Sequence, residues 1–140
     1  MQEKTLRVMN LMSKGAISCG EDTNIREVAQ ILAVNSCRYC IVTNREHEVL
    51  GIISARSILK AFGRDLEKTT AKDILLRHTY TIGPNTPVTE AIRLMDRRKI
   101  EHVIITSDRP GSKAVLGMLH VEDILSAMLR EEDSKKNASM

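Results

Sequence analysis

Three cysteines and four histidines are the side chains of this 140-residue chain best suited to nucleophilic or metal chemistry. Cys37 and Cys40 have the C-x-x-C spacing of half a zinc site, and Cys19 and His47 are conceivable further ligands. A structural zinc site normally adds a second closely spaced pair, which the sequence lacks. Cys40 also falls in a β-branched run that predicts a buried strand, where cysteine acts as a small apolar side chain. We therefore expect no metal site.

The other reactive side chains do not form a catalytic motif. Catalysis needs a nucleophile with a positioned base, or a metal with an open coordination position. The histidines are scattered, no H-x-x-x-H pair occurs, and the sequence has no phosphate loop of the G-x-x-x-x-G-K type. The sequence therefore predicts a protein that is not an enzyme and requires no cofactor.

Composition and charge exclude several classes of protein. Apolar residues make up 42% of the chain and charged residues 28%, which is the balance of one globular domain. The longest apolar stretch, residues 114–119, is far shorter than the roughly 20 residues of a membrane-spanning helix. Residues 1–10 contain no apolar signal core, so we expect a cytoplasmic protein without a membrane partner. The net charge of +3 forms no concentrated basic face, so no nucleic-acid partner is expected.

The chain contains two copies of one sequence unit. Residues 23–29 align with residues 86–92 at an offset of 63. After a three-residue insertion in the second copy, residues 49–51 align with residues 115–117. We therefore divide the chain into two repeats, a linker and a polar C-terminal tail that is expected to fray: residues 8–63, 71–129, 64–70 and 130–140.

Each repeat is expected to fold in the order strand, helix, strand, strand, helix. Thr23 and Thr86 suit the N-cap positions of the first helices. These helices carry apolar stripes at helical spacing, formed by Ile25, Val28, Ala29 and Leu32 or by Val88, Ala91, Ile92 and Met95. Apolar runs predict paired strands at residues 40–43 and 49–53, and at residues 103–106 and 115–119. Because about 60 residues bury little core alone, we expect one α+β domain in which the repeats pack sheet to sheet with pseudo-twofold symmetry.

The closing segments of the two repeats resemble a known family. Residues 51–59 (GIISARSIL) and 117–125 (GMLHVEDIL) each begin with a glycine and two apolar residues and lead into a helix. Residues 79–95 (TYTIGPNTPVTEAIRLM) and 8–12 (VMNLM) add further matching segments. Together with the tandem βαββα pattern, they resemble the cystathionine β-synthase (CBS) domain pair, also called a Bateman module. The resemblance covers almost the whole chain.

The resemblance implies a regulatory module that binds an adenine nucleotide or a related adenosyl compound between its repeats. AMP, ADP, ATP and S-adenosylmethionine are the expected ligands. In this family, a Ser/Thr and an Asp after the glycine meet phosphate and ribose, and the strand before the first helix and the central strand hold adenine. The implied ligand contacts are Ser18, Arg38, Ser54, Arg56, Tyr80, Thr81, Ile82, His102, Val103, Ile104, Leu119, His120 and Asp123.

Each repeat carries only half of the family's polar pair. The first repeat has Ser54 at the Ser/Thr position but Ser57 at the Asp position, whereas the second has Asp123 but His120. A carboxylate can accept hydrogen bonds from both ribose hydroxyls, so Asp123 is the expected main ribose acceptor and the second repeat the expected tighter site.

Structural roles are alternatives for the same residues. Asp123 also suits the first turn of a helix, where the macrodipole favours a carboxylate. Ser18 and Thr81 can bond turn backbone instead of adenine. The remaining polar candidates can be solvated side chains at loops and strand ends: Arg38, Arg56, His102 and His120.

Two functions of different class fit these features, and nucleic-acid binding is a third possibility that rests only on the net charge of +3. The first is a ligand sensor that signals the occupancy of its site to a regulated protein. The second is a ligand-free structural or interaction module, favoured by the incomplete polar pair in each repeat. In either case we expect a homodimer, because the closing helices carry more apolar side chains than one small core needs: Ile58, Leu59, Phe62, Ile124, Leu125 and Met128.

Overall fold

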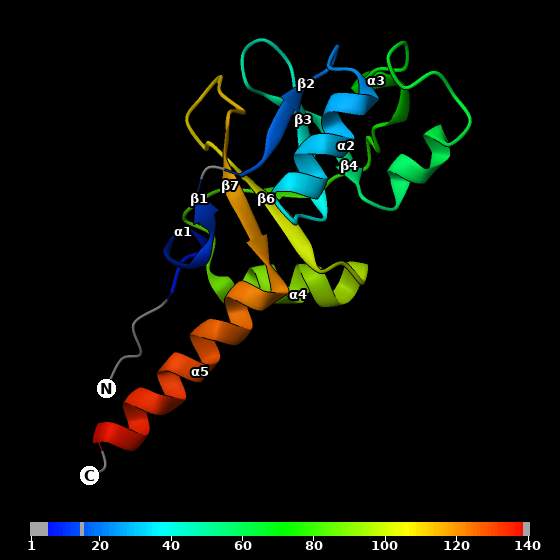
Figure 1. Cartoon of the computed structure of the whole chain (residues 1–140). Helices are drawn as coiled ribbons and strands as arrows, with labels where there is room; N and C mark the ends of the chain where they lie inside the picture. Colours follow the sequence, from blue (N-terminus) through cyan, green and yellow to red (C-terminus); the bar gives the residue numbers. More distant parts are fainter. Residues whose placement is uncertain (1–5, 15, 139–140) are drawn as a thin grey trace. The chain divides into compact units, whose positions relative to one another are not determined.

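The computed structural model describes residues 6–14 and 16–138, which form two compact units (Figure 1). The first-repeat unit comprises residues 16–79 and 109–115. The second-repeat unit comprises residues 6–14, 80–108 and 116–138. Each unit combines helices with a β-sheet, which confirms the predicted α+β class.

The first-repeat unit contains a three-stranded sheet in the order β2-β3-β4. Strand β2 runs parallel to β3, and β3 runs antiparallel to β4. The closing helix is a 3-10 helix, η1, and a short helix, α3, follows it. The elements are β2 (Ser18–Gly20), α2 (Ile25–Val34), β3 (Tyr39–Thr43), β4 (Val49–Ser54), η1 (Ser57–Ala61) and α3 (Ala71–Ile74).

The second-repeat unit contains a four-stranded sheet in the order β1-β7-β6-β5. Its elements are α1 (Val8–Leu11), β1 (Ser13–Lys14), β5 (Thr81–Ile82), α4 (Val88–Arg98), β6 (His102–Thr106), β7 (Val115–His120) and α5 (Val121–Ala138). The segment after residue 129, expected as a fraying tail, continues α5 as helix to Ala138. Among the described residues, no helix combines the length and apolar character needed to cross a bilayer.

Helices α2 and α4 form where the apolar stripes predicted them. Helix α2 buries Ile25, Val28 and Leu32, and the side chain of Asn24 caps it by accepting a hydrogen bond from the backbone N–H of Glu27 at 2.9 Å. The N-cap is therefore one residue later than predicted. Helix α4 buries its own stripe in the same way, except that Ile92 remains 42% exposed.

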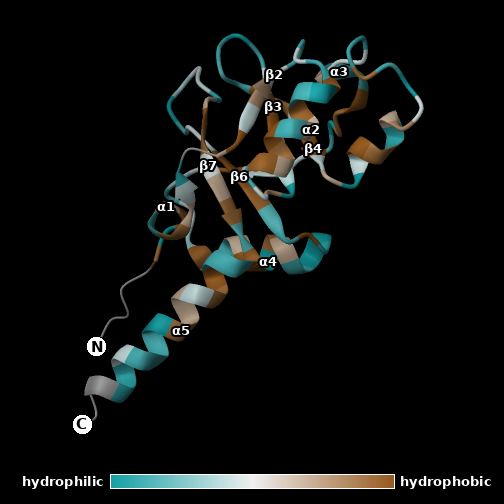
Figure 2. Ribbon diagram, in the orientation of Figure 1, coloured by the Kyte–Doolittle hydropathy of each residue, from teal (hydrophilic) through white to brown (hydrophobic). Residues whose placement is uncertain are grey.

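Each sheet packs one face against its helices, and its longer strands, β3 and β4 or β6 and β7, are rich in apolar residues (Figure 2). Alternate residues of the central strands lie on the other face, because successive side chains in a strand point in opposite directions. The side chains on this other face are also buried, with at most 4% of their surface exposed: Ile41 and Ile52 in the first-repeat unit, and Ile104 and Met118 in the second. Burial on both faces explains why these strands are continuous apolar runs rather than alternating ones.

The first segment of each sequence repeat belongs to the compact unit built mainly by the other repeat. Strand β1 pairs antiparallel with β7, so that Ser13 lies beside Met118 and Lys14 beside Gly117. In the first-repeat unit, Leu76 pairs with Ile52 in the same manner. The contiguous sequence repeats, 8–63 and 71–129, therefore differ from the compact units.

Candidate functional site

The strand edge formed by β5 and β6 carries the candidate adenine contacts of the second repeat. Strand β5 runs parallel to β6, with Thr81 opposite Ile104. The backbone N–H of Ile104 donates to the carbonyl of Tyr80 at 3.1 Å. Thr81 is exposed, whereas Ile104 is buried on the sheet face away from the helices. The predicted contacts Tyr80, Thr81 and Ile104 are thus adjacent.

The end of β7 and the first turn of α5 carry the candidate ribose and phosphate contacts. The backbone N–H of His120 donates to the Asp123 carboxylate at 2.8 Å, and the N–H of Val121 donates to the carbonyl of Glu101 at 3.0 Å. These two bonds form a turn that also brings His120 near His102, the first residue of β6. Asp123 therefore lies in the first turn of α5, the structural position that the sequence left open, and its carboxylate is held beside His120.

Burial keeps His102 neutral at physiological pH. Desolvation lowers the pKa of its imidazole, and the positive charge that His120 can carry lowers that pKa further. Glu101 opposes both effects by a smaller amount. His102 is therefore a neutral hydrogen-bonding group and not a cation.

Three predicted contacts have their side chains in the core beneath the sheet. Val103 and Leu119 are fully buried in the cluster formed with α4 and α5, and Ile82 packs against the same cluster. Strand alternation is the reason, because these residues point to the helix-covered face. Their side chains lie on the opposite side of the sheet from Ile104.

The first-repeat unit builds an equivalent turn from other residues. Ser54 and Ser57 bond each other reciprocally: the Ser54 N–H donates to Ser57 Oγ at 2.8 Å, and the Ser57 N–H donates to Ser54 Oγ at 2.9 Å. The N–H of Ala55 donates to the carbonyl of Arg38 at 2.8 Å. Arg38 and Arg56 are exposed beside this turn.

Ser18, the remaining predicted contact, lies on strand β2. It pairs with Ile41 of β3 and is exposed, which corresponds to the placement of Thr81 beside Ile104. In each unit, the predicted contacts outside the core lie at one strand edge and one turn.

The three thiols lie together in the core of the first-repeat unit. Cys40 is fully buried and Cys19 is 9% exposed, while Cys37 packs against the same cluster. A hydrogen bond between the thiols of Cys19 and Cys40 raises the pKa of Cys40 and lowers the pKa of Cys19. Among the described residues, no group of three or more histidine, cysteine or acidic side chains could hold a metal ion.

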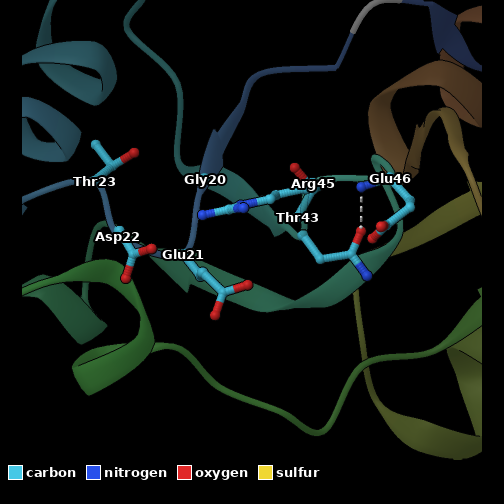
Figure 3. Close-up of a pocket in the computed structure, with 8 residues that line it drawn as sticks. Gly20, Glu21, Asp22, Thr23, Thr43, Arg45 and Glu46 are labelled. Carbon is cyan, nitrogen blue, oxygen red and sulfur yellow. Dashed lines mark hydrogen bonds between the residues drawn. The ribbon is translucent and has the colours of Figure 1, made fainter.

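A cavity of about 580 Å³ in the first-repeat unit was not predicted from the sequence. Two loops line it, residues 20–23 after β2 and residues 43–46 after β3. Figure 3 shows Arg45 extending between these loops, with Glu21, Asp22 and Glu46 around it. Asp22 is paired with Lys72 at 3.0 Å. Short loops of common polar residues give no periodic or motif signal, so pattern analysis could not identify this cavity.

Sequence comparison identifies the family of this fold. The sequence model of the CBS domain matches residues 8–64 and again residues 71–130. The chain belongs to the CBS domain family. As a CBS domain pair, it has the fold that its tandem βαββα pattern predicted, and solved CBS domain pairs share that fold.

Two of those solved structures contain adenosyl ligands. The CBS domain pair of protein MJ0100, in complex with 5′-methylthioadenosine and S-adenosyl-L-methionine, is 25% identical, with a TM-score of 0.74. The match covers 88% of this chain and 99% of that one. The CBS domain protein PAE2072 from Pyrobaculum aerophilum, complexed with AMP, is 29% identical, with a TM-score of 0.72 and coverage of 84% and 89%.

Curated relatives of this CBS domain pair are longer proteins. The mitochondrial CBS domain-containing protein CBSX3 of Arabidopsis thaliana is 29% identical over 127 residues, which cover 84% of this chain and 60% of that protein. The uncharacterised protein RP505 of Rickettsia prowazekii is 26% identical over 106 residues, which cover 76% of this chain and 32% of that protein. The chain therefore spans less than two thirds of these relatives.

Proposed function

We propose that this CBS domain pair is a non-enzymatic regulatory module in the cytoplasm that binds an adenine nucleotide or another adenosyl compound. The module signals to a regulated protein whether its site is occupied. Two relatives of the same fold, at 25% and 29% identity, hold such compounds, which supports the ligand class. A ligand can bias the regulated protein only by binding two arrangements of the module with different affinities.

The single observation that carries the proposal is the position of Asp123. Its carboxylate is held by the His120 N–H at 2.8 Å, in the first turn of α5. A carboxylate oxygen retains acceptor capacity after one such bond, so Asp123 can still accept from ribose hydroxyls. Thr81 and Ile104, on the β5–β6 edge of the same unit, are proposed to flank the adenine.

Ser57 in the first-repeat unit makes a weaker acceptor. Its hydroxyl already accepts from the Ser54 N–H and donates to the Ser54 carbonyl at 3.0 Å. Ser57 is only 4% exposed, so little of its side chain is accessible to a ligand. We therefore propose that the second-repeat site is the tighter one for the adenosine group.

Isothermal titration of the parent with AMP, ADP, ATP and S-adenosylmethionine tests the proposal. Hydrogen bonds to charged groups contribute roughly 1.5–3 kcal/mol against about 1 kcal/mol for neutral ones. Asp123→Ala is therefore expected to weaken the tight phase by tenfold or more. Ser57→Ala is the matched control and should leave that phase nearly unchanged. Equal binding by Asp123→Ala and the parent would show that the ribose assignment is wrong.

The alternative is a ligand-free interaction module. It is favoured by the exposed apolar side chains that remain in the structure, among them Phe62 at 92% and Met128 at 58% exposure. The same side chains support a homodimer in either case. If all four compounds fail to bind, and a partner is captured equally with and without nucleotide, the interaction module replaces the sensor.

A further inference from the structure

Helix α5 carries an exposed apolar stripe. Leu125, Met128 and Leu129 lie three and four residues apart, so they share one face of the helix, and each is at least half exposed. Beyond them α5 continues to Ala138, past residue 130, where the match to the CBS domain ends, and it projects from the sheet of its own unit (Figure 1). The second-repeat unit therefore leaves these three side chains, which we name the α5 stripe, uncovered.

A second exposed apolar surface lies at the 3-10 helix of the first-repeat unit. Leu59 belongs to η1, and Phe62 ends this helix three positions later. Residues three apart lie above one another in a 3-10 helix, so these two side chains are neighbours. Leu59 is 69% exposed and Phe62 is 92% exposed. The first-repeat unit therefore leaves this pair, which we name the η1 stripe, open to solvent.

The charges beside the two stripes are opposite in sign. Residues 125–133 carry three acidic side chains and one basic side chain, a formal charge of −2, and the carboxylates follow directly after the α5 stripe. Residues 55–64 carry a formal charge of +3 and no acidic side chain. In the part of the chain that the structure describes, the ion pairs include none of these charged groups. All of them are exposed: Arg56, Lys60 and Arg64 beside η1, and Arg130, Glu131, Glu132 and Asp133 on α5.

We propose that the α5 stripe of one copy packs against the η1 stripe of a second copy. Contact between unlike stripes brings acidic side chains of α5 beside basic side chains of η1. Contact between like stripes would instead bring carboxylate against carboxylate and cation against cation. The two segments also match in length, since residues 125–132 rise by about 10 Å along α5 and residues 56–61 rise by about 10 Å along η1. With twofold symmetry, the contact forms twice.

This inference rests on the homodimer put forward with the proposed function, and it needs no bound ligand. Burial of the apolar side chains supplies the affinity, and Phe62 is the expected anchor because large aromatic side chains dominate the energetics of interfaces. Opposite charges around such a centre mainly select which faces meet. Because these charges are exposed, the selection should weaken as salt screens them.

Sedimentation equilibrium of charge-reversal variants tests the pairing at about 50 mM and about 300 mM salt. Lys60→Glu/Arg64→Glu should raise the Kd of the dimer at least about tenfold at low salt, because both contacts become repulsive. The control Arg93→Glu/Lys113→Glu makes the same change of net charge at exposed residues outside both stripes. It should leave the Kd within about twofold of the parent value.

A charge exchange within α5 reverses the other partner without changing the net charge. The exchange keeps oppositely charged pairs four residues apart, which support the helix, but it puts cations next to the α5 stripe. It consists of Glu131→Lys, Glu132→Lys, Lys135→Glu and Lys136→Glu. This variant alone should raise the Kd at least about tenfold at low salt. Combined with Lys60→Glu/Arg64→Glu, it should return the Kd to within about threefold of the parent value, whereas contact between like stripes predicts neither the loss nor the rescue.

Phe62→Ala tests the contact independently of charge, because a side chain exposed to this extent contributes little to the fold. It should raise the Kd at least about tenfold. Circular dichroism establishes that each variant is folded.

A parent that dimerises with a Kd unaffected by all these variants overturns the pairing of the stripes and leaves the homodimer standing. A parent that is monomeric at every concentration measured overturns both, and the occupant of the stripes is then another protein. Titration with AMP and S-adenosylmethionine is a separate readout, because its failure overturns the ligand sensor without bearing on the contact between copies.

Discussion

Replacing Gly117 by alanine is expected to loosen the segment formed by α1 and β1. A Cβ at position 117 would overlap the carbonyl oxygen of Ser13 and approach the Met12 sulfur to 3.2 Å. Ser13 belongs to β1, which pairs with β7 across this glycine. The overlap is with backbone, so no side-chain rotation relieves it and β1 must move away from the sheet.

The magnitude follows from opposing effects. Overpacking in a close contact costs typically about 1–3 kcal/mol, and each weakened ladder hydrogen bond adds about 1 kcal/mol. Alanine also restricts the unfolded chain, which favours folding by about 0.4–1 kcal/mol. We expect Gly117→Ala to lower the free energy of unfolding by about 2 kcal/mol.

Urea unfolding followed by circular dichroism measures this loss. Gly20→Ala is the control, because its Cβ would meet only Thr23 Oγ1 at an ordinary 3.7 Å. That variant should stay within about 0.5 kcal/mol of the parent. If Gly117→Ala is as stable as Gly20→Ala, the glycine is not required by the packing of β1, and the reasoning fails.

Three further predictions concern pH, the thiol core and assembly. Folding lowers the pKa of His102 below 6.5, so the folded protein keeps its full stability above pH 6.5 and loses stability as the pH falls below that value. His102→Gln should flatten this decrease in the melting temperature at acid pH. A mutation of the exposed His78 should leave the decrease unchanged. Cys40→Ser places a hydroxyl in the fully buried thiol core and should cost about 1–3 kcal/mol in urea, against little for the less buried Cys37→Ser. Leu125→Asp, at a half-exposed apolar position, should convert a dimer to a monomer in light scattering; a parent that is already monomeric at micromolar concentration would refute the homodimer.

The elements of the fold could be predicted from the sequence because their signals are local. The spacing of Ile25, Val28 and Leu32 indicates a helix with one buried face, and the structure buries all three. The apolar runs that became β3 and β6 were predicted as buried strands for the same reason. Errors occurred at boundaries, where Asn24 rather than Thr23 caps α2, and at the polar end of α5, whose helix the sequence pattern did not indicate.

The family resemblance named candidate contacts, and the structure shows which of them lie together. The family resemblance identified Asp123 and His120, which share one turn, and Thr81 and Ile104, which share one strand edge. It also included Val103 among the contacts, although strand alternation turns its side chain into the helix-covered core. Which face of a strand meets the helices is a property of the whole sheet, so residue-by-residue transfer of a motif does not show it.

The sequence by itself determined the duplication, the apolar periodicities and the charges of every side chain. Only the tertiary structure decided which distant segments pack together. Val8 is fully buried in a core built mainly by residues 88–124, and Gly117 has no side chain where β1 crosses it. The physical reason is that periodicity reflects the conformation of neighbouring residues, whereas the pairing of remote segments depends on which sheet edge and which apolar face each segment covers.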